Sequence, residues 1–193
     1  MDKYAFVTVG TTQFDLLIET IIQNPDVIHV LVDLLKIKKI VLQTGRSQMP
    51  SFDHLPIAIE HYQYKDSIEN DIQHASLVIS HAGAGTILQT LEAHRPLLVV
   101  VNEKLMNNHQ LEIAHEMEKQ GYLFHCTCST LDEGLKKLVN HQFQLYEKGD
   151  PLWPRFIMIL FILLLRNKYK KLSYSFVNTN LLDYDAIFIF FNV

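Results

Sequence analysis

Short apolar segments alternate with amphipathic segments along the first 140 residues of the chain. Residues 4–9 (YAFVTV) are rich in β-branched and aromatic side chains and end at Gly10, which is typical of a buried strand. In the segment that follows, apolar side chains recur with the spacing of one helix face, at Phe14, Leu17, Ile18, Ile21 and Ile22. The pattern therefore predicts a strand followed by a helix.

The same alternation continues to about residue 140. Further strands are predicted at residues 37–43, 56–64, 77–80, 96–101 and 122–126. Further helices are predicted at 68–74 and 107–120, after Thr86 as far as about residue 93, and after Thr130 as far as about residue 139. Strands separated by such helices indicate βαβ crossovers and a parallel sheet covered on both faces. We expect one α/β domain with a doubly wound parallel sheet over residues 1–145.

Residues 146–193 form a divergent apolar and basic tail. Residues 156–165 (FIMILFILLL) are a solid apolar run, but a bilayer-spanning helix needs about 20 residues. A basic patch and a second apolar stretch at 186–191 follow. Three interpretations stay open: a buried terminal helix and strand, an interfacial or partner-docking segment, and a variant terminus outside the fold.

Composition narrows the class of protein. The 193 residues are 48% apolar and 20% charged, which excludes a disordered or low-complexity chain. The formal net charge of −4 gives no general basic surface, so we predict no nucleic-acid partner. The N-terminus enters a strand at once, so we expect no signal peptide and a cytoplasmic location. Cys126 and Cys128 form a lone C-x-C pair, which we expect to be reduced structural thiols.

Two loops have the chemistry of an anion site. In an open parallel sheet, ligands bind at the carboxyl ends of the strands. There Gly10-Thr11-Thr12 allows close backbone approach and adds two hydroxyl donors. Residues 80–86 (SHAGAGT) lie directly before a helix, where free amides and the helix dipole favour an anion. The residues alone leave two interpretations open, a diphosphate site and tight packing of strands against helices.

Other polar residues carry weaker signals. Residues 107–110 (NNHQ) at a predicted helix start either cap that helix or bind sugar hydroxyls. None of the ten histidines is spaced i, i+4 from another with a third ligand or a glutamate base, so we predict no metal and no cofactor. The chain also lacks a nucleophile motif such as G-x-S-x-G.

Four blocks carry a resemblance to a known family. They are F-V-T-V-G-T-T-x-F-D-x-L-I (6–18), Y-K-D-S-I-x-x-D-I (64–72), L-V-I-S-H-A-G-A-G-T (77–86) and N-E-K-L-M-N-N-H-Q-L-E (102–112). Over roughly residues 3–131 the chain resembles the catalytic, cytosolic subunits of the two-subunit UDP-N-acetylglucosamine (UDP-GlcNAc) transferase of asparagine-linked glycosylation. More remotely, it is similar to the C-terminal, donor-binding half of a bacterial GlcNAc transferase of glycosyltransferase family 28.

The resemblance implies a Rossmann-like domain that is one half of a GT-B glycosyltransferase. It places Gly10, Thr11 and Thr12 near the donor diphosphate and sugar, and the backbone at Tyr64 and Lys65 against the uracil edge. The second loop, facing the diphosphate, comprises His81, Ala82, Gly83, Ala84, Gly85 and Thr86. The block near the donor sugar and ribose comprises Asn108, His109 and Gln110.

One position departs from the family pattern. Three residues after Thr86, where the family usually has a glutamate for the ribose hydroxyls, this chain has Gln89. A glutamine accepts one such hydrogen bond but carries no charge, so weaker donor affinity is expected. Glu92 lies one turn further on, and we expect it to face the wrong way to replace the glutamate.

The resemblance also implies a reaction and a partner. The reaction is transfer of GlcNAc from UDP-GlcNAc to GlcNAc-diphosphodolichol, the second step of lipid-linked oligosaccharide assembly, on the cytosolic face of the endoplasmic reticulum. A membrane-anchored subunit would bind the acceptor, and His81 and His109 are the candidate catalytic bases in this chain. Two alternatives stay open: an inactive or regulatory nucleotide-sugar-binding variant, and an interaction-only subunit that competes for the partner.

Overall fold

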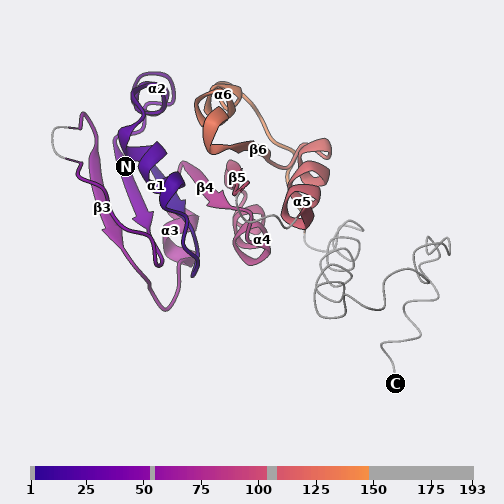
Figure 1. The fold of residues 1–193 in the computed structure, drawn as a ribbon. Helices are drawn as coiled ribbons and strands as arrows, with labels where there is room; N and C mark the ends of the chain where they lie inside the picture. The colour runs from indigo at the N-terminus through magenta and orange to yellow at the C-terminus, as the bar shows by residue number, and fades with distance from the viewer. Residues whose placement is uncertain (1–2, 53–54, 104–107, 148–193) are drawn as a thin grey trace, which may run out of the picture. The chain divides into compact units, whose positions relative to one another are not determined.

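The computed structural model describes residues 3–52, 55–103 and 108–147. Its six strands are β1 (Tyr4–Thr8), β2 (Lys39–Gln43), β3 (Ala58–Tyr62), β4 (Leu77–His81), β5 (Leu97–Val101) and β6 (Phe124–Thr127). All neighbouring strands are parallel, in the order β3-β2-β1-β4-β5-β6 (Figure 1). This is a doubly wound, Rossmann-like arrangement, and it confirms the predicted fold class.

Helices cover both faces of the sheet. They are α1 (Asp15–Gln23), α2 (Pro25–His29), η1 (Val30–Leu34), α3 (Glu69–His74), α4 (Ala84–Glu92), α5 (Asn108–Lys119), η2 (Cys128–Thr130) and α6 (Leu131–Lys137). One continuous core joins α1, α2, η1 and α6 to the sheet residues on one face. Figure 1 shows α4 and α6 on opposite sides of β5. The sheet is therefore the middle layer of three.

The apolar runs that predict strands become the buried centre of the sheet. The five residues of β5 (LLVVV) are all buried, as a strand covered on both faces requires. β3 lies at the edge of the sheet, and most of its residues are exposed. Its contact with this core is made by Ile59, which is partly buried. The difference follows from position, because an edge strand is shielded by fewer neighbours.

The sequence analysis assigns no element to residues 24–36, where the structure has α2 and η1. The signal for α2 is local: Asn24 caps the helix by accepting a hydrogen bond from the amide of Asp26 at 2.9 Å. Pro25 then occupies the first turn, where its missing N–H costs nothing. An Asn-Pro pair of this kind predicts a helix start.

Cys126 and Cys128 are both buried thiols, which agrees with the expected structural role. Burial raises the pKa of the Cys126 thiol to about 12, so the thiol stays protonated at neutral pH.

Within the described part of the chain, no helix combines the length and apolar character that a membrane crossing needs. The predicted tail lies outside the described residues from 148 onward, so its three interpretations stay predictions.

The core packing gives a prediction for stability. Ile79, in the middle of β4, is completely buried. We expect Ile79→Ala to lower the free energy of unfolding by about 2–5 kcal/mol, because it removes apolar contacts and leaves a cavity. Leu145→Ala is the control, since that side chain is 69% exposed, and it should change stability by less than about 0.5 kcal/mol. Urea unfolding measures both, and equal effects would contradict the described core.

Candidate functional site

The order of the strands reverses between β1 and β4. β2 and β3 follow β1 toward one edge of the sheet, and β5 and β6 follow β4 toward the other edge. Thr8 at the end of β1 pairs in register with Ser80 of β4, so the loops that follow leave the sheet side by side. Such a switch point is the usual ligand-binding position in an open α/β sheet. It brings together the two loops that the sequence analysis singles out.

The His81 ring packs between glycines of the two loops. A Cβ atom on Gly10 would lie 2.7 Å from Cε1 of His81, and one on Gly83 would lie 2.5 Å from Nε2 of His81. Both distances are far below a normal contact, so neither position accepts a larger residue while the ring stays in place. Close packing of the ring thus explains why both positions are glycine. As a result, the backbone of both loops carries no side chain at these positions.

A third loop, after β2, supports the first. Gly45 has a φ of +57°, and a Cβ there would lie 2.5 Å from the carbonyl oxygen of Thr12. The amide of Arg46 donates a hydrogen bond to the same oxygen at 3.0 Å. The sequence analysis did not include Gly45 in the site. Its signal is the position directly after a buried strand next to the switch point.

A buried polar pair holds the start of the first loop. Thr8 donates its hydroxyl hydrogen to Oε1 of Gln43 at 2.5 Å and accepts a hydrogen bond from the amide of Gly10 at 3.0 Å. The hydroxyl of Thr12 donates to the carbonyl of Val9 at 2.7 Å. The expected two hydroxyl donors of this loop are therefore reduced to one, because Thr12 is committed to the backbone and Thr11 is the exposed hydroxyl.

The second loop leads into the N-terminus of α4. Gly83 stands at the N-cap without a side chain, and its carbonyl accepts the amide of Ile87 at 3.0 Å. The first amides of a helix have no acceptor within it. A Cβ on Gly85 would meet nothing within 4 Å, so open space lies at this end of the helix. The free amides of the first turn and the positive end of the helix dipole lie at the same end of α4, which suits an anion.

His81 is the predicted base that the structure places at this junction. Its Nδ1 is buried, and the backbone of Thr8 is the polar group that acts on the ring. Burial lowers the pKa of His81, so the imidazole is neutral at neutral pH. A neutral ring is able to accept a proton, but the two glycines beside it also give it a packing role.

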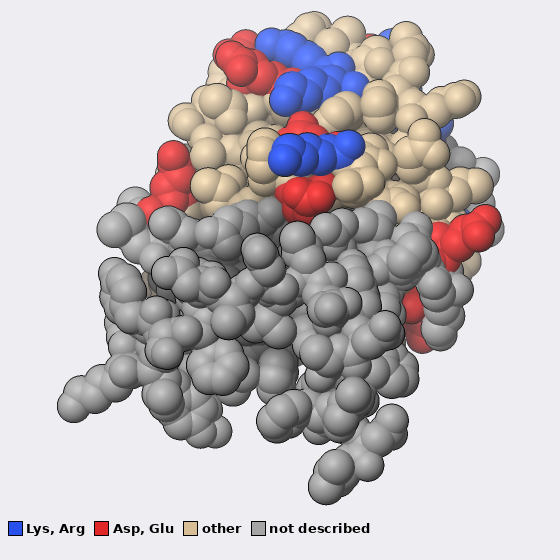
Figure 2. All heavy atoms as spheres, turned by 90° about the vertical axis from the view of Figure 1, so that its right-hand side faces the viewer, with Lys and Arg blue, Asp and Glu red and all other residues tan. Residues whose placement is uncertain are grey.

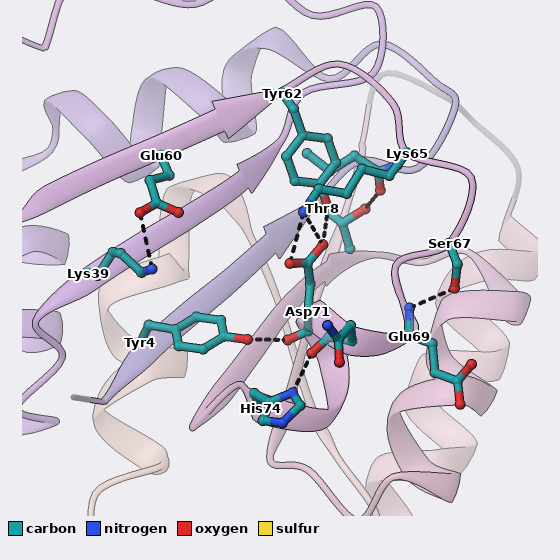
Figure 3. Close-up of polar contacts among 12 residues, drawn as sticks. Tyr4, Thr8, Lys39, Glu60, Tyr62, Lys65, Ser67, Glu69, Asp71 and His74 are labelled. Atoms are coloured by element: carbon teal, nitrogen blue, oxygen red, sulfur yellow. Dashed lines mark hydrogen bonds and ion pairs between the residues drawn. The ribbon is translucent and has the colours of Figure 1, made fainter. Parts of the chain in front are cut away.

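The loop after β3 is anchored by Asp71 of α3 (Figure 3). The carboxylate of Asp71 accepts a hydrogen bond from the hydroxyl of Tyr62 at 2.6 Å and binds Nζ of Lys65 at 2.8 and 3.0 Å. Nζ of Lys65 also lies 4.0 Å from the centre of the Tyr62 ring. The backbone of Asp71 accepts a further bond from Tyr4 at 2.7 Å.

This network fixes what the predicted loop residues present to a ligand. The Lys65 side chain turns back onto the protein, so the segment offers its backbone and the exposed ring of Tyr64. Burial, followed by the hydrogen bond to Asp71, raises the pKa of Tyr62 far above its usual value, and its hydroxyl stays a donor. The candidate site residues of the sequence analysis did not include Asp71, although it belongs to the quoted block at 64–72.

A cavity of about 370 Å³ lies between α3 and α4. Its lining is mostly polar and comprises Ser67, Glu69, Ile72, Gln73, Gln89, Glu92 and Ala93. Gln89 is thus placed on a cavity wall. The expectation that Glu92 faces the wrong way is incorrect, because residues three apart lie on one helix face and both line this cavity.

The third predicted block is described only in its backbone. Asn108, His109 and Gln110 form the first turn of α5, after the end of β5. Their side chains lie outside the described part of the structure, so their predicted contacts with a sugar, and the predicted role of His109 as a base, stay predictions.

Comparison with known proteins identifies the family of the chain. The family model for the glycosyltransferase family 28 C-terminal domain matches residues 4–152. The UDP-N-acetylglucosamine transferase subunits ALG13 of Mus musculus and Homo sapiens are each 50% identical to the chain over 131 residues, which is 67% of this chain and 11% of those proteins. The chain therefore spans about one ninth of the length of these two relatives. The ALG13 subunit of Yarrowia lipolytica is 33% identical over 144 residues, 72% of each chain.

Solved structures share the fold. An NMR solution structure of ALG13 has a TM-score of 0.63 and 23% identity, covering 80% of this chain and 94% of that one. A crystal structure of MurG from Acinetobacter baumannii has a TM-score of 0.52 and 17% identity, covering 72% of this chain and 40% of that one. Because the family model spans well over half of the sequence, the chain belongs to glycosyltransferase family 28 and contains its C-terminal domain.

Proposed function

We propose that the chain is the donor-binding subunit of a UDP-GlcNAc transferase. It binds UDP-GlcNAc and, together with a membrane-anchored partner, transfers GlcNAc to GlcNAc-diphosphodolichol at the cytosolic face of the endoplasmic reticulum. The observation that carries the proposal is the junction of the Gly10 loop with the open N-terminus of α4, in a member of this glycosyltransferase family.

The diphosphate of the donor would lie at the N-terminus of α4. The amides of Ala84, Gly85 and Thr86 supply hydrogen-bond donors there, and the bare backbone of Gly10 allows close approach from β1. Thr11 adds the exposed hydroxyl of the first loop. This arrangement needs no side-chain cation, because the helix end itself supplies positive potential.

The nucleoside would lie along α4, toward the cavity between α3 and α4. Gln89 is about one turn beyond the first amides of α4, and its side-chain carbonyl would accept a ribose hydroxyl. The backbone near Tyr64 and Lys65, held by Asp71, would bind the uracil edge. Glu92 and Glu69 also line the cavity and supply two carboxylates, whereas the side chain of Gln89 is uncharged.

In the transfer, an acceptor hydroxyl attacks the anomeric carbon of GlcNAc. The new C–O bond forms as the bond to the diphosphate breaks, and UDP leaves with the electron pair. Amides aimed at the diphosphate stabilise this growing negative charge, and a bound, oriented acceptor lowers the entropic cost. The acceptor proton passes to a base, for which His81 and His109 are the candidates in this chain.

A second candidate function is supported by Gln89. If the missing carboxylate weakens donor binding enough, the chain would act as an inactive nucleotide-sugar-binding variant that competes for the same partner. Both candidates require donor binding at the same site, and only transfer distinguishes them.

Transfer is tested in membranes that contain the partner but are depleted of their own catalytic subunit. We expect addition of the chain to produce the chitobiosyl lipid from UDP-GlcNAc and a GlcNAc-diphosphate lipid. A competent homologue added to the same membranes verifies partner and acceptor. UDP-GlcNAc binding without product would contradict the transferase proposal and favour the competing variant.

The diphosphate position is tested at Gly85, where a side chain meets open space. We expect Gly85→Asp to weaken UDP binding about tenfold or more, because a carboxylate close to the diphosphate repels it. The asparagine in Gly85→Asn is nearly the same size as aspartate but carries no charge, so this variant should weaken UDP binding much less. Neither change should lower stability, since glycine is a poor helix residue. Equal UDP affinity of the two variants, measured by calorimetry, would count against this position.

The ribose contact is tested by Gln89→Glu. A charged acceptor makes a stronger hydrogen bond to a hydroxyl, so we expect about fivefold tighter UDP binding. The 2′,3′-dideoxy analogue of UDP lacks both ribose hydroxyls and should not gain. Calorimetric titration of both ligands measures the difference, and an equal response to the two would rule out this contact.

A further inference from the structure

Three side chains with metal-ligand chemistry converge between α5 and β6. His115 and Glu118 lie three residues apart on α5, and His125 lies on β6. One ligand atom from each lies within 4.8 Å of the other two. Nδ1 of His125 contacts Oε2 of Glu118, and the rings of His115 and His125 are 5.8 Å apart at 86°. None of the three belongs to the candidate donor site.

The donor set matches zinc. Two imidazole nitrogens and one carboxylate oxygen are ordinary Zn²⁺ ligands, and water completes a tetrahedral site. Bonds of the usual length place zinc ligands roughly 3.4 Å apart. Nδ1 of His125 and Oε2 of Glu118 lie closer together than this and must separate, and the third ligand atom, which lies within 4.8 Å of the others, must adjust to the same spacing. The side chain of His115 is exposed and free to make this movement, while Glu118 and His125 are partly buried.

Two lysines lie near the cluster, and both are paired with glutamates. Nζ of Lys137 lies 3.8 Å from Oε1 of Glu118, the carboxylate oxygen that does not contact His125. Lys119 is paired with Glu116 at 3.9 Å. In Figure 2, acidic and basic side chains of the described residues lie next to one another on this side of the molecule. Lys137 therefore reduces the affinity for a cation without occupying the oxygen that faces the histidines.

We propose that His115, Glu118 and His125 form a zinc site that clamps α5 to β6. The clamp acts on the helix whose first turn carries Asn108, His109 and Gln110. Zinc would thus fix the helix that follows β5 at the ligand-binding edge of the sheet. The role is structural, and it does not depend on the proposed transfer reaction.

The test is calorimetric titration of the chelator-treated full chain with zinc chloride. We expect one zinc ion per chain, an increase in Tm on binding, and a d–d spectrum of tetrahedral type when cobalt replaces zinc. His115→Ala should weaken zinc binding by at least about tenfold, as should the nearly isosteric Glu118→Gln. His29→Ala, a histidine on α2 that pairs with Asp33, is the control and should keep the affinity of the unmodified chain.

His115 is exposed, so His115→Ala should fold normally, and circular dichroism verifies this. Lys137→Gln should strengthen binding, because it removes the neighbouring positive charge. Absence of zinc binding by the unmodified chain would overturn the proposal. Unchanged zinc affinity in both His115→Ala and Glu118→Gln would overturn it as well.

Discussion

The arrangement of the candidate site depends on one contact, the His81 ring held between Gly10 and Gly83. The reversal of strand order between β1 and β4 forces the two loops together, and the ring fills the space that Cβ atoms would otherwise need. Bare backbone therefore lines the junction, beside the free amides of α4. A larger residue at either glycine would separate the loops and move the N-terminus of α4.

Much of the fold follows from local patterns. Apolar runs such as residues 97–101 predict buried strands, and β5 is found there. The rule that ligands bind at the carboxyl ends of strands selects two loops, and the pairing of β1 with β4 brings these loops together. The Gly45 support of the first loop and the Asp71 anchor of the third depend on contacts between segments far apart in the chain. Such contacts have no local signature. The helix at Pro25 did have one, in the cap at Asn24.

The cluster of the proposed zinc site shows why spacing along the sequence does not reveal every group of side chains that the fold brings together. His115 and Glu118 share a helix face, but the third side chain, His125, comes from the next strand. Only the packing of α5 against β6 brings it within reach. Glu92 illustrates the opposite case, since simple helix geometry already places it on the face of Gln89. Its position gives the cavity a carboxylate close to the residue that departs from the family pattern.

The most direct test of the donor site is an NMR titration of the ¹⁵N-labelled full chain with UDP-GlcNAc. The account predicts that the largest amide shifts occur at Gly10 and from Gly83 to Thr86, with smaller shifts at Gln89 and its neighbours. Shifts confined to other parts of the sheet edge, or none at millimolar ligand, would contradict a donor site at the junction of β1 and β4.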